Sequence, residues 1–250
     1  MMEQYLAELV GTMILVIFGD GVVANVCLGK TKGHGSGWIV IATGWGVGVA
    51  VAVYAVARIS GAHINPALTL ALAAIGQFSW SLVPGYIIAQ MAGGVLGGIV
   101  VWLAYLPHWA VTEDPTSKLG VFCTVPQIRT VVGNFICEVI GAAILLFGVL
   151  AIADNATQIK AAGPIDLSAV FSTGINPLLV GVLVWGIGLS LGGPTGYAIN
   201  PARDLGPRIA HAILPIAGKG SSDWAYSWVP VVAPIAGAIL GAALYVAVGF

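Results

Sequence analysis

The chain reads Pro-Thr-Gly-Tyr-Ala-Ile-Asn-Pro-Ala-Arg-Asp-Leu-Gly-Pro-Arg over residues 194–208 and Ser-Gly-Ala-His-Ile-Asn-Pro-Ala-Leu-Thr-Leu-Ala over residues 60–71. Both stretches contain Asn-Pro-Ala, at residues 65–67 and 200–202. Asn followed by Pro is a favoured helix start, because the Asn side chain caps free backbone N–H groups and Pro tolerates the first helical position. We therefore predict that a helix begins at each Asn-Pro-Ala box.

The weakly polar stretches that follow the two boxes are short. They run from Asn65 to Ile75 and from Asn200 to Ile213, well below the roughly 20 residues that a helix needs to cross a bilayer. Two such helices meeting tip to tip would total about 25 residues, or roughly 37 Å at the helical rise, which is enough for one composite crossing. We therefore expect two half-helices whose N-terminal ends meet in the middle of a membrane.

The residues beside the boxes point to a family. Ser-Gly-Ala-His precedes Ile64 and the first box, and Arg203-Asp204 follows the second. With these extensions the chain resembles the major intrinsic proteins, the family of aquaporins and glycerol facilitators, over essentially its whole length. The resemblance implies an all-α polytopic membrane protein with the aquaporin fold: six transmembrane helices, two re-entrant half-helices and an inverted repeat of three plus three helices.

The composition excludes several other classes. A 250-residue chain with 58% hydrophobic and 8% charged residues is neither a soluble domain nor a disordered chain. Its net charge of −1 leaves no basic stripe, so we expect no nucleic acid partner. The three cysteines show no close pairing, and no nucleophile with a base or cluster of metal ligands is apparent. We therefore expect no enzyme, no cofactor and no metal site.

Six windows of apolar sequence are long enough, or nearly so, to span a bilayer. They fall near residues 4–28, 38–58, 84–106, 131–153, 177–193 and 228–249. Just before the fifth window, Asn176-Pro177-Leu178 is interpreted as an ordinary cap that opens a membrane helix. The longer connections, residues 107–130 and 154–176, are interpreted as solvated loops.

The two halves of the chain repeat in sequence. The run from Ala7 to Gly11 parallels residues 137–141, so that Glu8 corresponds to Glu138. The glycine pairs at 93/97 and 237/241 also correspond, and we expect both to pack helices together. An odd number of spans in each half forces opposite orientations, which places a site at the midplane. We predict one channel domain over residues 1–250, with inverted halves at about 1–115 and 127–250.

In the family, solute passes along the two half-helices. Hydrogen-bond partners must replace lost water there, because each unsatisfied polar group costs several kcal/mol in hydrocarbon. The resemblance assigns backbone carbonyls that line the passage to Gly61, Ala62, His63, Gly196, Tyr197 and Ala198. It assigns the pore centre to the two boxes, Asn65, Pro66, Ala67, Asn200, Pro201 and Ala202. The two Asn side chains would offer N–H groups to the solute, while the positive helix ends repel protons and other cations.

The family separates water channels from glycerol channels at an outer constriction, the selectivity filter. The resemblance implies that Arg203 binds solute hydroxyls there, and counting back from the boxes assigns the other positions to Trp45, Gly188 and Tyr197. Water-selective members typically have His where Gly188 stands, so we expect its absence to leave room for a polyol beside an aromatic corner. Many glycerol facilitators have Phe in place of Tyr197, which leaves the solute range open. Asp204 is typical of glycerol facilitators, and its ion pair with Arg203 is the structural alternative to a filter role for the Arg.

Glu8 and Glu138 occupy equivalent depths in the two halves. In the family such carboxylates hold the re-entrant segments through hydrogen bonds, so we expect Glu8, Glu138 and Asp204 to give structural support. A proton-coupled secondary carrier that uses the two glutamates is the alternative from another class. Asp20 is not explained by the motifs.

The resemblance implies a passive channel for glycerol and related small neutral solutes, with water as a companion, that excludes protons and ions. A water-selective aquaporin, or a facilitator for dihydroxyacetone, urea or protonated lactic acid, is the alternative within the family. The resemblance also implies a homotetramer in the lipid bilayer of the cell membrane, with both termini cytoplasmic. The positive-inside tendency runs against this orientation, because most Lys and Arg residues would then lie outside.

Overall fold

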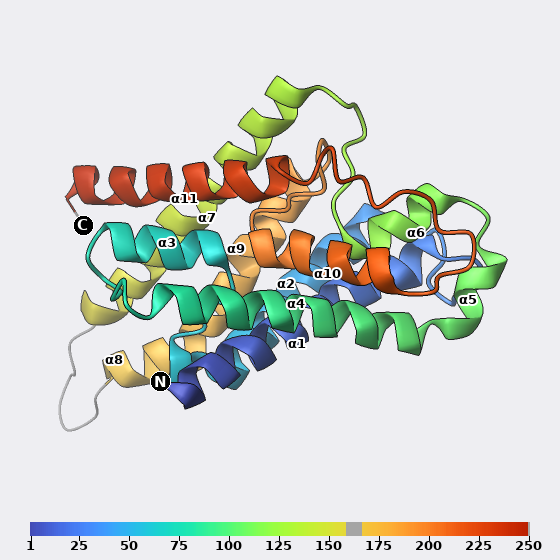
Figure 1. Cartoon of the computed structure of the whole chain (residues 1–250). Helices are drawn as coiled ribbons and strands as arrows, with labels where there is room; N and C mark the ends of the chain where they lie inside the picture. Colours follow the sequence, from blue (N-terminus) through green and yellow to red (C-terminus); the bar gives the residue numbers. More distant parts are fainter. Residues whose placement is uncertain (159–166, 250) are drawn as a thin grey trace.

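The computed structural model describes residues 1–158 and 167–249, and every regular element in these ranges is a helix (Figure 1). In chain order the elements are α1 (Met2–Cys27), α2 (Trp38–Ser60), α3 (Pro66–Ala74), α4 (Val83–Ala104), α5 (Leu106–Val111), α6 (Pro115–Phe122), α7 (Val131–Gln158), α8 (Leu167–Val170), the π-helical turn η1 (Phe171–Ile175), α9 (Asn176–Leu191), α10 (Pro201–Ile213) and α11 (Val229–Val248).

Six helical stretches are long and apolar enough to cross a membrane. They are Met2–Cys27, Trp38–Ser60, Val83–Ala104, Val131–Asn155, Leu167–Leu191 and Val229–Val248. The short helices α3 and α10 lie between the second and third and between the fifth and sixth of these stretches. The predicted fold of six spans and two half-helices is therefore confirmed.

The fifth span begins ten residues before the predicted window. Asn176 is the first residue of α9, but it has helical angles (φ −51°, ψ −47°) and follows η1 without a break, and within the described residues its Oδ1 has no hydrogen-bond partner, so the interpretation of Asn176 as an ordinary cap is wrong. Pro177 carries no N–H and cannot make the ordinary helical bond. The chain widens into the π turn just before it, and the Tyr54 hydroxyl donates to the Gly174 carbonyl there at 2.5 Å.

The connection over residues 107–130 is folded and not merely solvated. It contains most of α5 and all of α6, and the side chain of Lys118 is buried and donates to the Ala217 carbonyl. The carboxylate of Asp114 caps α6 by accepting the N–H groups of Thr116 and Ser117, both at 2.9 Å. Residues 159–166 of the other long connection lie outside the described ranges.

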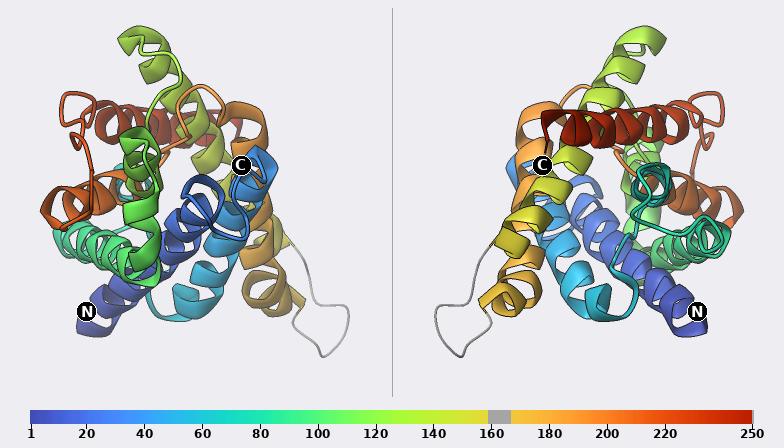
Figure 2. Two further views of the ribbon diagram at one scale, coloured as in Figure 1. Left: turned by 90° about the vertical axis from the view of Figure 1, so that its right-hand side faces the viewer. Right: turned by 90° about the vertical axis from the view of Figure 1, so that its left-hand side faces the viewer.

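The two half-helices lie end to end along one line, and α4 and α11 each contact both of them (Figure 1). Both chain termini lie at the same end of the bundle, and α5 and α6 lie at the opposite end (Figure 1). The end-on views show the long helices crossing one another obliquely, with the half-helices between α4 and α11 (Figure 2). The bundle thus holds the two half-helix tips near its middle.

Glycines bring the long helices close enough to fix this geometry. A Cβ at Gly93 of α4 would lie 2.3 Å from a carbonyl oxygen of α1, and a Cβ at Gly237 of α11 would lie 2.3 Å from one of α7. Gly97 and Gly241 make similarly close approaches to the same two helices. The expected packing role of both glycine pairs is confirmed, because any side chain there would force the helices apart.

Candidate functional site

The N-terminal tips of α3 and α10 are joined by two amide side chains. Nδ2 of Asn65 donates to the Ile199 carbonyl at 2.9 Å, and Nδ2 of Asn200 donates to the Ile64 carbonyl at 2.7 Å. Each Asn Oδ1 also accepts a backbone N–H of its own helix, at 2.9 Å and 3.0 Å, as the sequence predicts for a cap. Because an amide NH₂ group carries two donors, one N–H of each Asn remains free of these bonds.

The backbone that leads into α3 is held by one buried carboxylate. Glu8, which is 0% exposed, accepts the backbone N–H groups of His63 at 2.9 Å and Ile64 at 2.6 Å. It also accepts the Ser60 hydroxyl at 2.6 Å and the Gln90 amide at 2.7 Å. These four bonds orient the N–H groups of the segment toward α1.

Glu138 makes the equivalent contacts in the second half. It is 1% exposed and accepts the N–H groups of Ala198 and Ile199, both at 2.9 Å, and the Thr195 hydroxyl at 2.6 Å. These contacts fix the irregular backbone that leads into α10.

Both leading segments adopt left-handed backbone conformations. The φ angles are +51° at Ala62 and +43° at Ile64, and +39° at Tyr197 and +44° at Ile199. Such angles are costly for residues with a Cβ, especially the β-branched isoleucines, and persist only where the surroundings enforce them. The bonds to the two glutamates supply that enforcement.

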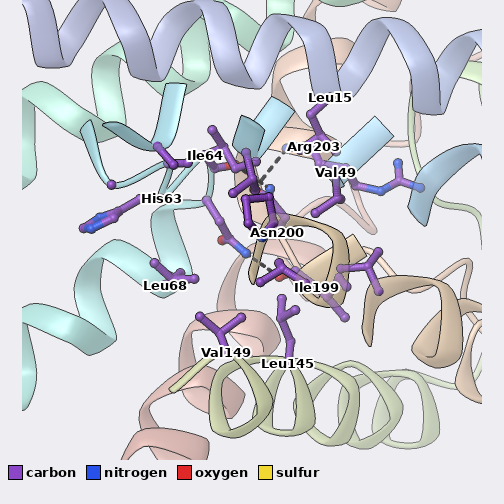
Figure 3. A pocket seen from close by; sticks show the side chains of 18 of the residues that line it. Leu15, Val49, His63, Ile64, Leu68, Leu145, Val149, Ile199, Asn200 and Arg203 are labelled. Carbon is purple, nitrogen blue, oxygen red and sulfur yellow. Dashed lines mark hydrogen bonds between the residues drawn. The ribbon is translucent and has the colours of Figure 1, made fainter. Parts of the chain in front are cut away.

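An internal cavity of about 240 Å³ follows the half-helix tips. It is bordered by the two leading segments and both box asparagines, and by apolar side chains of α1, α2 and α7 such as Leu15, Val49, Leu145 and Val149 (Figure 3). The ring of His63 turns aside to contact Thr69 Oγ1 at 3.1 Å, so His63 borders the cavity mainly through its backbone (Figure 3). The lining therefore combines hydrogen-bonding groups with an apolar surface.

A second, outer cavity meets the first at three of the predicted filter residues. Trp45, Tyr197 and Arg203 border both cavities. The guanidinium carbon of Arg203 lies 3.9 Å from the centre of the Trp45 ring, within the range of a cation–π contact. An aromatic surface and a cationic donor thus stand at the junction of the two cavities.

Gly188 lies behind Tyr197 and does not open free space. A Cβ at Gly188 would lie 2.8 Å from both Cζ and the hydroxyl oxygen of Tyr197. The expectation that the missing side chain leaves room for solute is therefore wrong as stated, because Tyr197 itself occupies that volume.

Asp204 is paired with Arg208 and not with Arg203. Arg208 donates from Nη2 at 2.9 Å and from Nε at 3.0 Å to the same Asp204 oxygen, and both side chains are fully buried. The other Asp204 oxygen accepts the backbone N–H of Thr124 at 2.8 Å and its hydroxyl at 2.5 Å. The sequence analysis missed Arg208, although its i, i+4 spacing from Asp204 on a helix is the signal that would have found it.

Asp20 is completely buried on α1, and within the described residues neither of its carboxylate oxygens has a hydrogen-bond partner. Asp20 is therefore a buried acidic side chain of α1 to which the motifs assign no role.

The outer cavity is bordered by an ionised cap. Hydrogen bonds from Ser117 and from the backbone of Thr116 hold the pKa of Asp114 below its ordinary value. The mouth of this cavity therefore keeps a negative charge at neutral pH.

In the part of the chain that the structure describes, no three His, Cys, Asp or Glu side chains cluster as metal ligands would.

Comparisons with known proteins agree with this arrangement. The sequence model of the family described as "Major intrinsic protein" matches residues 1–245. The chain is 62% identical to a "Probable glycerol uptake facilitator protein" of Thermotoga maritima, over 98% of both chains. It is 55% identical to the "Glycerol uptake facilitator protein" of Bacillus subtilis, over 98% of this chain and 84% of that one. The crystal structure of the aquaglyceroporin from Plasmodium falciparum superposes with a TM-score of 0.82 at 28% identity, covering 98% of this chain and 95% of the other.

Proposed function

The chain belongs to the major intrinsic protein family, and we propose that it is a passive membrane channel that conducts glycerol and related small neutral solutes. One observation carries this proposal. The cavity along the half-helix tips combines hydrogen-bonding groups with an apolar surface and ends at Trp45, Tyr197 and Arg203. A polyol has the same two-sided character, with hydroxyls along a carbon chain, so such a lining can replace its hydration.

The filter selects by chemistry as well as by width. Arg203 donates hydrogen bonds to solute hydroxyls and repels cations, while Trp45 and Tyr197 contact the carbon chain. The buried pair of Asp204 and Arg208 supports this role, since it leaves the Arg203 guanidinium free of the Asp204 carboxylate. Arg203 therefore presents its charge to the passage.

The pore centre excludes protons. The two helix N-termini that meet at Asn65 and Asn200 create a positive potential, and the free N–H of each Asn side chain donates to the passing solute. Glu8 and Glu138 turn the N–H groups of the leading segments away from the cavity, which leaves carbonyls there to accept from the solute. Solutes that pass one after another along the cavity thus form hydrogen bonds with fixed donors and acceptors.

A proton-coupled carrier is less well supported. Both glutamates already accept several hydrogen bonds that hold the irregular backbone, so protonation of either would disturb the half-helix it supports. The family and the named relatives are transport proteins, and we propose no catalytic activity and no cofactor for this chain.

The long helices expose many large apolar side chains, among them Ile88, Ile144, Leu189 and Leu244. We propose that these side chains contact lipid or neighbouring subunits of a homotetramer in the cell membrane, with both termini cytoplasmic.

We also propose that the chain is one channel domain with inverted halves at about residues 1–115 and 127–250. The matching contacts of Glu8 and Glu138 support the repeat.

Uptake of radiolabelled glycerol into proteoliposomes tests the proposed function. A channel gives uptake that rises linearly with glycerol concentration and does not respond to an uncoupler. Uptake that saturates and collapses with the uncoupler would instead support a carrier. If proteoliposomes take up glycerol no faster than protein-free vesicles while their water permeability is high, the chain is a water channel.

A further inference from the structure

Trp38 stands beside the filter but belongs to none of the positions that the family resemblance assigns. It is the first residue of α2, placed there by Gly37, whose φ of +97° turns the chain sharply. Its side chain borders the outer cavity together with Trp45, Tyr197 and Arg203.

The indole of Trp38 ties the start of α2 to the end of α9. Its Nε1–H donates to the carbonyl of Gly188 at 2.8 Å. Gly188 lies in the last turn of α9, which ends at Leu191, where carbonyls lack partners within the helix. The bond therefore fixes the backbone on which the filter side chain of Tyr197 rests.

The ring of Tyr197 is held by van der Waals packing. Its ring meets Trp38 edge to face, with the centroids 5.8 Å apart at 76°. It lies in a slot left by two glycines, because a Cβ at Gly188 would be 2.8 Å from its hydroxyl and a Cβ at Gly192 would be 2.5 Å from its Cδ1. Cζ2 of Trp38 would lie 2.6 Å from that same Gly192 Cβ.

The side chain of Tyr197 adds no hydrogen bond of its own to this packing among the described residues. Within the described residues the Tyr197 hydroxyl has no hydrogen-bond partner, so no directional bond fixes the ring. The glycine slot confines one side of the ring, and Trp38 confines it toward the outer cavity.

We propose that Trp38 is a positioning residue of the filter, which keeps Tyr197 in its slot and so sets the width of the passage for polyols. This inference rests on the proposed function. Without the indole, the Tyr197 ring gains freedom toward the outer cavity and the junction of the two cavities widens. Longer polyols then pass more readily relative to glycerol. A Trp that served only as an interfacial anchor would affect insertion or stability but not this ratio.

The test measures stopped-flow permeabilities of erythritol, a four-carbon polyol, and of glycerol in proteoliposomes with matched protein content. Trp38→Ala removes the donor and the ring, while Trp38→Phe keeps an aromatic edge without the donor. Trp80→Ala is the control, because Trp80 is 59% exposed and lies between α3 and α4, away from the filter. We expect the erythritol-to-glycerol ratio to rise roughly three- to tenfold in Trp38→Ala, which corresponds to about 0.7–1.4 kcal/mol in relative barrier.

The ratio should rise less in Trp38→Phe and stay unchanged in Trp80→Ala. If Trp38→Ala does not fold, a raised ratio in Trp38→Phe still supports the inference. An unchanged ratio in every folded Trp38 variant, with normal glycerol flux in the wild type, overturns the inference alone. A wild type without glycerol flux above that of empty liposomes overturns the proposed function, and the inference with it.

Discussion

Gly188 and Tyr197 share one volume at the filter, and this makes position 188 sensitive to a single methyl group. In Gly188→Ala the new Cβ lies 2.8 Å from the Tyr197 ring and hydroxyl, a distance that forces the ring to move. We expect the displaced ring to narrow the passage and lower glycerol permeability roughly tenfold, the effect of about 1.4 kcal/mol on the barrier.

Gly186→Ala on the same helix is the matched control, because a Cβ there meets nothing within 4 Å. Stopped-flow glycerol permeability of the two variants is the measurement. Equal permeabilities in Gly188→Ala and Gly186→Ala would show that the ring is not held against Gly188.

The hydroxyl of Tyr197 lies in the apolar slot beside Gly188. The oxygen is buried and without a hydrogen-bond partner among the described residues, and such a group costs about 1–3 kcal/mol. Tyr197→Phe should therefore keep glycerol permeability within about twofold and raise the melting temperature in detergent by roughly 2–4 °C per kcal/mol gained. A clear fall in melting temperature would mean that the hydroxyl has a partner in the membrane.

The filter residues could be predicted from the sequence only in part. Counting along the motifs located Trp45, Tyr197 and Arg203, which meet at the junction of the cavities. The same counting misjudged the space at Gly188, because a spacing identifies a position but not which neighbour fills it. Trp38 was missed for the same reason, since its partner is 150 residues away in the chain.

The half-helices depend on buried carboxylates for their shape. Glu138→Ala would leave the Ala198 and Ile199 N–H groups and the Thr195 hydroxyl without their acceptor, at about 1–3 kcal/mol each. We expect a melting temperature in detergent that is lower by roughly 5 °C or more and a loss of glycerol flux.

Glu138→Gln separates support from proton transfer. The amide keeps one acceptor oxygen, so the loss of stability should be smaller than in Glu138→Ala, and the folded protein should still conduct glycerol. A stable Glu138→Gln protein with no flux would favour the carrier mechanism.

The six spans and both half-helices could be predicted from the sequence, because hydrophobic length and Asn-Pro caps act locally. The capping interpretation failed at Asn176, because the π-helical turn η1 runs directly into α9 there and the Asn176 side chain caps no backbone N–H among the described residues. The outcome there depends on the π turn before Pro177 and on the contact of Tyr54 with Gly174, neither of which is a local property. The folding of α5 and α6 was also missed, since burial of Lys118 relies on a carbonyl from the distant residue Ala217.

The whole channel should work independently of pH across the physiological range. The pKa of Asp114 at the outer cavity is lowered by the hydrogen bonds of Ser117 and Thr116. Because the pKa of Asp114 is lowered in the folded state, the cap contributes its full stabilisation at any pH above the ordinary pKa of the carboxyl. This stabilisation is lost only as the pH falls through the lowered pKa. We expect equal glycerol permeability from about pH 5 to pH 8. A titration with a midpoint near pH 6 would require another group in the passage.

The proposed channel requires that glycerol crosses the membrane through the cavity beside the half-helix tips. Val149 of α7 borders this cavity (Figure 3), while Ile144 of the same helix is 44% exposed on the outer surface. The direct test is the stopped-flow glycerol permeability of Val149→Trp and Ile144→Trp in proteoliposomes. We predict that Val149→Trp falls to the level of protein-free vesicles and that Ile144→Trp conducts like the wild type. Wild-type permeability in a correctly folded Val149→Trp protein would contradict the claim.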